Sequence, residues 1–231
     1  MLKTVVNCNI NVSTLSCYLA GHPDQAFVCQ LINSLQFGFD TGFCGKRGSV
    51  YTRNRPSALA HLEEVHKYLD KEIACGHTKG PFLSAPFSDF VSSPSACIPK
   101  KDGSLRLILD LSAPMGQSIN DGISAEEFKL TYVKFDSIVK MIASHGNGAL
   151  LAKVDLKHAF RQCPVCPADW PLLGYTWEDK YYFDVRLPFG LISAPALFNM
   201  LADAIHWICL ARGEGDLALL RRLHHCRTIG F

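Results

Sequence analysis

Asp155 is the residue of this chain best placed for chemistry, because it ends an apolar run. Five of the six residues from 149 to 154 are apolar, which favours a strand covered on both faces. The residues from Leu156 to Phe160 contain no Gly or Pro and are compatible with a helix. A carboxylate where a buried strand turns into a helix is a common position for a ligand in sheet-based folds. The alternative is an N-cap, in which the carboxylate accepts a hydrogen bond from a free backbone N–H.

A second chemical feature is a basic turn. Lys100 and Lys101 precede an Asp-Gly pair, and Arg106 follows it by three residues. Lys supplies a point charge and Arg a bidentate fork, so this tip could hold a polyanion such as a triphosphate. The alternative is an ordinary solvated turn.

A β-hairpin over residues 95–111 must position that turn. Asp102-Gly103 is a strong turn signal between two strand-like runs. The two-residue period of the second strand separates an apolar face from a mixed one. The apolar face carries Leu105, Leu107, Leu109 and Leu111, and the other face carries Arg106, Ile108 and Asp110.

A third feature is the tight turn from Leu187 to Pro195, Leu-Pro-Phe-Gly-Leu-Ile-Ser-Ala-Pro, which leads into a helix. The helix is predicted to begin near Ser193, to tolerate Pro195 in its first turn, and to run to about Arg212. Its predicted buried face consists of Leu197, Leu201, Ile205 and Ile208.

The remaining elements form a scaffold. Apolar residues at spacings of three and four predict one helix over Ser57–Cys75, with the stripe Leu59, Leu62, Val65, Leu69 and Ile73. A shorter helix is predicted over Asp136–His145, capped by Asp136, and a second hairpin over 174–187. Residues 1–45 show no sustained period, and we expect weak order there.

Composition sets outer limits. With 231 residues, 48% hydrophobic and 19% charged, the chain belongs to the folded globular class. Its net charge of +2, from 23 basic and 21 acidic residues, is too small to imply a nucleic-acid partner, so such a partner requires local patches. No signal peptide is apparent, and no apolar run approaches the ~18 residues of a membrane span. We therefore expect an intracellular protein of the cytoplasm or nucleus, not secreted and without a membrane partner.

The ten cysteines are irregularly spaced. Cys163 and Cys166 form a CxxC pair, but no second pair or HxxxH follows, so a zinc site lacks half of its ligands. His224, His225 and Cys226 are adjacent and cannot all face one ion. Free thiols in a reducing compartment are the preferred interpretation.

The basic hairpin, the Asp155 strand end, and the Leu187 turn followed by Ser-Ala-Pro-Ala-Leu-Phe198 stand in one order. Together they resemble the reverse transcriptase domain of retroelements, most closely that of DIRS-like retrotransposons, over about residues 53–210. The resemblance implies an α+β, right-hand polymerase fold: fingers plus a partial palm, an antiparallel sheet with packed helices. It also implies three regions: a leader or upstream remnant over 1–45, fingers with the basic β-hairpin over 46–145, and a partial palm over 146–231.

The resemblance further implies roles. Asp155 would be the catalytic carboxylate that binds Mg²⁺, and Phe160 would lie under the sugar of the incoming nucleotide and exclude a 2′-hydroxyl. The partners would be an RNA or DNA template-primer and deoxynucleoside triphosphates. The oligomeric state is left open. The remaining residues expected to bind nucleotide are Lys100, Lys101 and Arg106 at the triphosphate, and Phe189 and Gly190 against the nucleotide and template.

The chain departs from the family in one respect. The family takes two further carboxylates from an aromatic-x-Asp-Asp turn, but the acids beyond position 200 are the isolated Asp203, Glu214 and Asp216. Because one carboxylate cannot hold two ions in register, we expect an incomplete RNA-directed DNA polymerase that is inactive alone. Two alternatives are a non-catalytic nucleic-acid-binding remnant of such a polymerase, and a fragment without a stable fold because a sheet edge is left unpaired.

Overall fold

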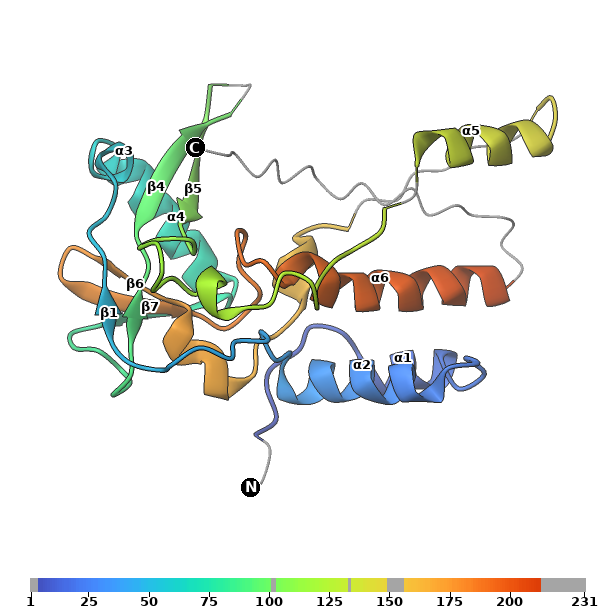
Figure 1. The fold of residues 1–231 in the computed structure, drawn as a ribbon, viewed down its shortest axis with the longest axis horizontal. Helices are drawn as coiled ribbons and strands as arrows, with labels where there is room; N and C mark the ends of the chain where they lie inside the picture. Colours follow the sequence, from blue (N-terminus) through green and yellow to red (C-terminus); the bar gives the residue numbers. More distant parts are fainter. Residues whose placement is uncertain (1–3, 101–102, 133, 149–155, 213–231) are drawn as a thin grey trace.

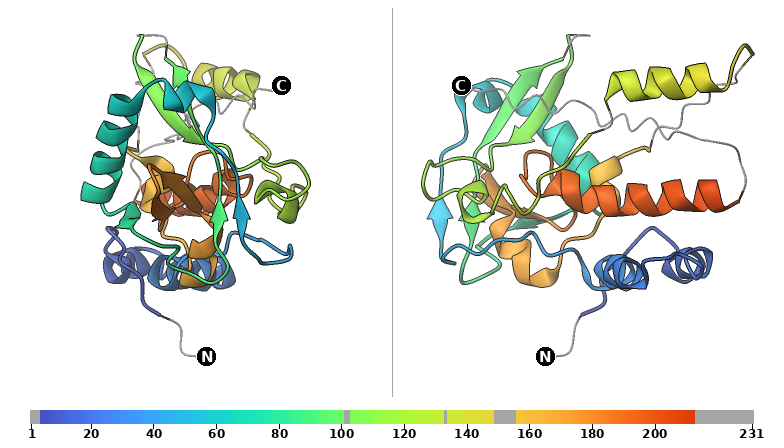
Figure 2. Two further views of the ribbon diagram at one scale, coloured as in Figure 1. Left: turned by 90° about the vertical axis from the view of Figure 1, so that its left-hand side faces the viewer. Right: turned by 45° about the vertical axis from the view of Figure 1, so that its right-hand side comes forward.

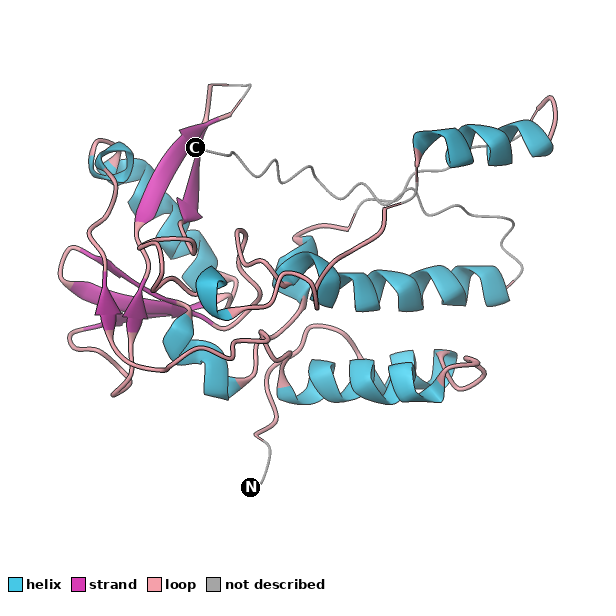
Figure 3. Ribbon diagram, in the orientation of Figure 1, coloured by secondary structure: helices cyan, strands magenta, loops and turns pink. Residues whose placement is uncertain are grey.

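The computed structural model describes residues 4–100, 103–132, 134–148 and 156–212. It is a mixed α+β fold in which helices pack around one larger and one smaller sheet (Figure 1, Figure 3). Its helices are α1 (Val12–Tyr18), α2 (Gln25–Phe37), α3 (Pro56–Leu59), α4 (Leu62–Ala74), α5 (Phe135–Ser144) and α6 (Ala194–Ala211), with the 3₁₀ turns η1 (Asn120–Gly122), η2 (Ala159–Gln162) and η3 (Pro167–Leu172). Its strands are β1 (Val50–Tyr51), β2 (Thr78–Phe82), β3 (Val91–Ser92), β4 (Ser95–Pro99), β5 (Leu105–Leu109), β6 (Gly174–Trp177) and β7 (Lys180–Asp184).

The larger sheet has the strand order β1-β3-β6-β7-β2. It is mixed, because β1, β3 and β6 are parallel neighbours whereas β7 is antiparallel to both β6 and β2. The expectation of an antiparallel sheet is therefore wrong for the β1-β3-β6 half of the larger sheet. A tight turn forces β6 and β7 to be antiparallel, and Glu178 and Asp179 take the positive φ values of 47° and 57° that such a hairpin turn requires. The long segment through α3, α4 and β2 separates β1 from β3 and allows a parallel neighbour.

The smaller sheet is the predicted hairpin β4–β5, which stands upright beside α3 and α4 (Figure 1). The predicted division of faces is confirmed: Leu107 and Leu109 are buried, whereas Arg106 is exposed. The buried face belongs to the main hydrophobic core together with residues of α4. The exposed face is thereby left for other contacts.

Residues 4–45 are better ordered than the sequence predicts. Asn11 accepts a hydrogen bond from the Thr14 N–H (3.0 Å) to cap α1, and Asp24 caps α2 through the Phe27 N–H (2.9 Å). Both helices lie beside α6, as Figures 1 and 2 show. Long-range packing onto α6, which a periodicity search cannot register, stabilises this pair. Its buried residues are Leu15, Leu19, Val28, Leu31 and Leu35.

The single helix predicted over Ser57–Cys75 is wrong. The chain leaves helical geometry at His61 (φ −134°, ψ 58°), whose ring bonds to the Ser57 carbonyl at 2.8 Å. The break separates α3, which packs on β4, from α4, which packs on β2 and β5. Leu59 and Leu62 consequently leave the predicted stripe and are exposed. The buried stripe of α4 is instead Val65, Leu69 and Glu72.

Helix α5 lies apart from the sheets and has no buried residue (Figure 2). Asp136 lies in its first turn, where its charge suits the helix dipole. The expectation that Asp136 is the N-cap is wrong, because the cap is Lys134, without a side-chain hydrogen bond.

Helix α6 follows the prediction closely, with Ser193 as N-cap and Arg212 as C-cap. Leu197 and Leu201 are buried as predicted, whereas Ile205 and Ile208 are half-buried. By length and mean hydropathy (18 residues, 1.3) α6 could cross a membrane, so the statement that no apolar run reaches that length is wrong. The buried N-terminal half of α6 lies in the main core, as a core helix of a globular protein does.

Candidate functional site

The structure describes most of the residues singled out for chemistry. Asp155 and Lys101 lie outside the described residues, as do His224, His225 and Cys226. Among the residues that are described, no group of three His, Cys, Asp or Glu side chains could hold a metal ion. The other predicted site residues are Lys100 and Arg106 on the hairpin, Phe160 on η2, and Phe189 and Gly190 in the turn before α6.

The segment that follows Asp155 is not the predicted helix. Leu156 is irregular and leads through a turn to His158, which takes a left-handed conformation with φ 54°. The chain then forms the four-residue 3₁₀ helix η2. Such short, tight turns have poorer hydrogen-bond geometry than an α-helix and depend on tertiary contacts.

Phe160 is the centre of an aromatic group. Its ring centroid lies 5.3 Å from that of Phe189 and 5.6 Å from that of Phe198, with interplanar angles of 47° and 69°. These tilted and edge-on arrangements are the ones that aromatic quadrupoles favour. Phe160 is 7% exposed and Phe189 41% exposed. The group therefore has a buried ring behind an accessible one.

The turn that carries Phe189 contacts the base of the hairpin. Gly190 has φ 93°, and a Cβ atom added there would lie 3.2 Å from the Leu109 carbonyl oxygen at the end of β5. A side chain at position 190 would be strained by this conformation and crowded by that backbone. Gly190 thus brings the Phe189 turn against Leu109 of the hairpin, which is three residues beyond Arg106.

Asn120 holds the turn that contains Gly190 and Ile192 through hydrogen bonds, a role that the sequence did not predict. Its Nδ2 donates to the Gly190 carbonyl (2.9 Å) and to Ser112 Oγ (2.9 Å), and its Oδ1 accepts from the Ile192 N–H (3.0 Å). Gly190 and Ile192 are about 70 residues away along the chain, whereas Ser112 is eight residues away. The side-chain amide of Asn120 thus bonds to both a backbone C=O and a backbone N–H of the turn, as a neighbouring strand would.

The basic side chains lie on the hairpin above this group. Lys100 and Arg106 are both exposed, and Arg106 pairs across the strands with Ile98. Gly103 (φ 78°) donates its N–H to the Lys100 carbonyl at 3.1 Å and helps close the tip. The base of the hairpin therefore contacts the turn that carries Phe189. Lys100 and Arg106 lie farther along the hairpin and are exposed to solvent.

A second charged group lies on the other side of η2 and was also missed. Arg161 is 3% exposed and pairs with Asp184 and Glu72. One signal for it exists in the sequence, because Glu72 falls on the same helical stripe as Val65 and Leu69. A carboxylate on an apolar stripe requires a buried partner, but the partner's identity depends on the tertiary fold.

The two CxxC thiols lie in environments that oppose their ionisation. Burial raises the pKa of Cys163 to about 12, and burial together with the Asp169 carboxylate raises the pKa of Cys166 to about 12. Metal ligation needs the thiolate, so these environments favour the protonated thiols. In the described part of the chain no third ligand joins them.

Sequence comparison finds retroelement relatives, although no family model matches the chain. It is 26% identical over 162 residues to the retrovirus-related Pol polyprotein from transposon opus of Drosophila melanogaster, covering 68% of this chain and 14% of that protein. It is 29% identical over 115 residues to the Pro-Pol polyprotein of simian foamy virus type 1, covering 50% of this chain and 9% of that protein. The chain thus spans about a seventh or less of the length of these curated relatives.

Structure comparison finds prototype foamy virus protease-reverse transcriptase, with a TM-score of 0.48 and 17% identity over 89% of this chain and 27% of that one. The foamy viral protease-reverse transcriptase in complex with RNA/DNA hybrid gives a TM-score of 0.46 and 17% identity, covering 89% of this chain and 28% of that one. The homologues of this chain are Pol polyproteins of retroviruses and retrotransposons.

Proposed function

We propose that this chain is part of the RNA-directed DNA polymerase of a DIRS-like retroelement, with the right-hand polymerase fold. Residues 46–145 form the fingers, residues 146–231 form a partial palm, and residues 1–45 belong to an upstream region. The protein acts in the cytoplasm or nucleus on an RNA or DNA template-primer and deoxynucleoside triphosphates. The Pol polyprotein relatives support this assignment.

One observation carries the proposal: three pieces of sequence that are distant along the chain meet at one place. Phe160 of η2 contacts Phe189 at a centroid distance of 5.3 Å, and Gly190 of the same turn abuts Leu109 of the hairpin. A nucleotide site needs such a combination, because a flat apolar wall and a small residue leave room for a sugar and base. The exposed cations of the hairpin add charge for the phosphates.

The chemistry is nucleotidyl transfer. The primer 3′-hydroxyl attacks the α-phosphorus of the nucleotide, and pyrophosphate leaves. Lys100, Lys101 and Arg106 stabilise the charge that grows on the departing phosphates. Phe160 discriminates sterically against a 2′-hydroxyl. Asp155 would help to hold Mg²⁺, which would act as a Lewis acid toward the hydroxyl and the phosphates when bound.

The 231-residue polypeptide contains no aromatic-x-Asp-Asp sequence. It therefore offers one of the three carboxylates that two ions require, and we expect it to be inactive alone. A primer-extension assay with Mg²⁺ or Mn²⁺ on an RNA template should give no product above background. Robust template-dependent synthesis by the purified chain would contradict this part of the proposal.

Equilibrium binding tests the site without requiring turnover. The chain on an RNA/DNA template-primer should bind dTTP more tightly than 5-methyl-UTP, which differs from it only by the 2′-hydroxyl, and Phe160→Val should remove most of this preference. Phe183→Val is a matched control, because Phe183 is equally buried but belongs to a separate cluster with Phe90 and Val185. Equal affinity for dTTP and 5-methyl-UTP in the unsubstituted chain would refute the assignment.

A second function, non-catalytic nucleic-acid binding by a polymerase remnant, is favoured by the missing acidic pair and the exposed Arg106. It predicts template-primer binding that weakens steeply with salt, and no response to nucleoside triphosphates. The same titration separates the two functions, since only the polymerase site should discriminate dTTP from 5-methyl-UTP.

A further inference from the structure

The inference concerns the buried ionic group behind η2, which the proposed nucleotide site does not use. Arg161 Nη1 lies 2.6 Å from Asp184 Oδ2 at the end of β7, and Arg161 Nε lies 3.1 Å from Glu72 Oε2 of α4. Arg161 Nη2 donates to the Tyr68 hydroxyl at 3.1 Å. One guanidinium thus connects η2 to a helix and a strand of the main sheet.

The carboxylates of Glu72 and Asp184 have further hydrogen-bond partners within the fold. His77 Nδ1 bonds to Glu72 Oε2 at 3.0 Å, and the Thr78 hydroxyl donates to Asp184 Oδ1 at 2.5 Å. The Tyr175 hydroxyl donates in turn to Thr78 Oγ1 at 3.2 Å. Because these bonds engage both Asp184 oxygens, Glu72 Oε2 and all three guanidinium nitrogens, the group is suited to holding structure rather than binding a ligand.

Charge balance favours the ionised forms of Arg161 and Glu72, whereas burial raises the pKa of Asp184 despite the Arg161 charge. Burial alone would lower the pKa of Arg161, but the carboxylates of Asp184 and Glu72 outweigh that effect and raise it. Burial likewise favours neutral Glu72, but the His77 hydrogen bond and the Arg161 charge hold the pKa of Glu72 below its usual value. An ionised, desolvated pair of this kind has strict geometry, because any displacement leaves a buried charge without its partner.

Helix η2 depends on this anchor. It has four residues, and it follows the left-handed His158. The Gln162 side chain donates to the Lys157 carbonyl at 3.1 Å, which is a local contact within the same turn. Arg161 adds the ties across the fold, including a hydrogen bond from Nη1 to the Arg186 carbonyl at 3.3 Å.

Phe160 and Arg161 are adjacent, so the orientation of one determines that of the other. Consecutive side chains of a 3₁₀ helix project about 120° apart. With Arg161 directed to Glu72 and Asp184, Phe160 is directed to Phe189 and Phe198.

We propose that Arg161 is a positioning residue of the nucleotide site: through its bonds to Glu72 and Asp184 it fixes η2, and thereby the ring of Phe160. This proposal rests on the proposed function for its consequence, which is sugar discrimination. The positioning of the ring is a separate statement and is measured separately.

The first experiment reads the ring directly. The full chain carries 4-fluorophenylalanine at position 160, and the ¹⁹F resonance is recorded for the parent, Arg161→Lys and Glu72→Gln. Lys keeps the charge but lacks the guanidinium fork, so we expect the resonance to move toward the solvent-exposed position. Glu72→Gln, which leaves the pair with Asp184 intact, should give a smaller shift and provides a second test if Arg161→Lys fails to fold.

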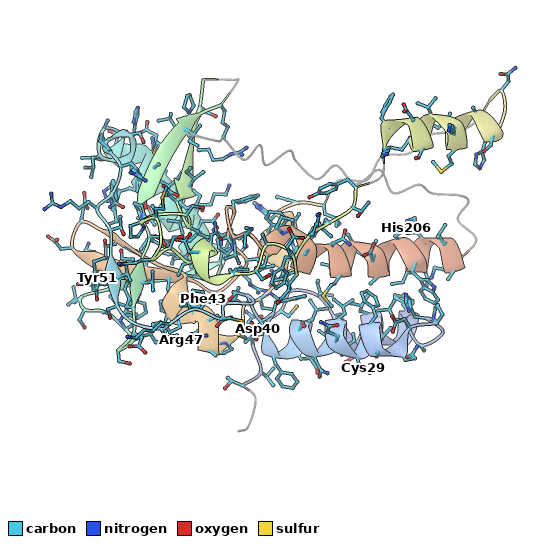
Figure 4. The ribbon with its side chains drawn as sticks, in the orientation of Figure 1. Cys29, Asp40, Phe43, Arg47, Tyr51 and His206 are labelled. Atoms are coloured by element: carbon cyan, nitrogen blue, oxygen red, sulfur yellow. The ribbon has the colours of Figure 1, made fainter. Side chains whose placement is uncertain are left out.

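Arg47→Lys is the matched control. Arg47 pairs with the buried Asp169 at 2.6 Å and donates to the Ala168 carbonyl at 2.6 Å. It lies beside Phe43 on the segment between α2 and β1 (Figure 4). Its replacement should leave the resonance of residue 160 unchanged. An unchanged resonance in folded Arg161→Lys, or equal shifts in Arg161→Lys and Arg47→Lys, would overturn the positioning role.

The second experiment compares the affinities for dTTP and 5-methyl-UTP in a double-mutant cycle. Arg161→Lys should reduce the preference for dTTP about tenfold, because small misplacements of site groups have effects of this order or larger. In a Phe160→Val background the same change should have no further effect, since Arg161 acts through Phe160. Additive effects would overturn the proposal. If Phe160→Val itself leaves the preference intact, the proposed function fails instead, while the ¹⁹F result still decides the positioning role.

Discussion

Arg161 and Arg106 carry the same guanidinium group in opposite surroundings. Arg161 is 3% exposed and bonds to two carboxylates and a tyrosine hydroxyl. Arg106 is exposed on the outer face of a two-stranded hairpin. A buried guanidinium with its donors occupied holds elements together, whereas an exposed one can exchange water for a ligand phosphate. The comparison separates the region that fixes the fold from the region that we propose to recognise an anion.

The largest effect is expected where the buried region loses a charge. Asp184→Ala should lower the free energy of unfolding by about 3–5 kcal/mol, because it leaves Arg161 buried without its shortest partner. Asp184 is fully buried and also accepts a hydrogen bond from Thr78. Urea denaturation followed by circular dichroism measures the change.

Glu63→Ala provides the control for that measurement. Glu63 forms an i, i+4 pair with Lys67 on α4 at 3.6 Å, and both side chains are at least 75% exposed. Exposed pairs of this kind contribute well under about 1 kcal/mol. A loss for Asp184→Ala as small as that for Glu63→Ala would end the distinction between the two regions.

A smaller effect is expected at Asn120, which joins the loops rather than the core. Asn120→Ala removes bonds to Gly190, Ile192 and Ser112, and should cost about 1–2 kcal/mol, since a typical hydrogen bond contributes roughly 0.5–1.5 kcal/mol net. The specific readout is the amide of Ile192, whose hydrogen exchange should accelerate.

Asn120→Asp sharpens this test. It keeps an acceptor for the Ile192 N–H but places a carboxylate oxygen against the Gly190 carbonyl. We expect the Ile192 amide to stay more protected than in Asn120→Ala. Unchanged exchange at Ile192 in both variants would show that the turn before α6 is held by other contacts.

The sequence predicts local elements well where two-residue or helical periods coincide with packing. The β4–β5 hairpin and its faces, the second hairpin, and α6 with its caps follow from such patterns. The α1–α2 pair was missed because its stability comes from packing against α6. The break at His61 was missed because periodicity counts spacing and does not register which sheet each half must contact.

In the candidate site, too, some residues are predictable from the sequence and others only from the fold. Phe160, Phe189 and Gly190 are identified by a resemblance carried in the sequence, and their mutual contact is a property of the fold. Arg161 binds partners that are between 23 and 93 residues away along the chain, and two of the three Asn120 partners are 70 and 72 residues away. No local pattern indicates such partners, with the exception of the carboxylate Glu72 on an apolar stripe.

The pH dependence of stability provides a third test of the buried region. The pKa of Glu72 is lower in the folded chain than its ordinary value of 4.5, since the His77 hydrogen bond and the Arg161 charge outweigh burial. Its contribution is therefore present above pH 4.5 and is lost as the pH falls through the lower, folded value. Glu72→Gln should show a smaller decrease in Tm between pH 6 and pH 3 than the parent chain. Parallel Tm profiles for the two chains would contradict this assignment.

The smallest effect on stability is expected at Arg106, and this is where the two regions should differ most clearly in binding. Arg106→Ala should change the free energy of unfolding by no more than about 0.5 kcal/mol, as surface substitutions usually do. In contrast, it should weaken dTTP binding to the chain on a template-primer, because a bidentate contact to the triphosphate is lost.

Arg106→Lys distinguishes charge from geometry at this position. Lys retains the charge without the fork, so its affinity for dTTP should lie between those of the parent and Arg106→Ala, and the difference should shrink as salt rises. Calorimetric titration at two salt concentrations measures both. If Arg106→Ala destabilised the fold as strongly as Asp184→Ala, or left dTTP affinity unchanged, exposure on the hairpin would no longer indicate recognition. The contrast with Arg161 would then be one of burial alone, without a division of roles between the two arginines.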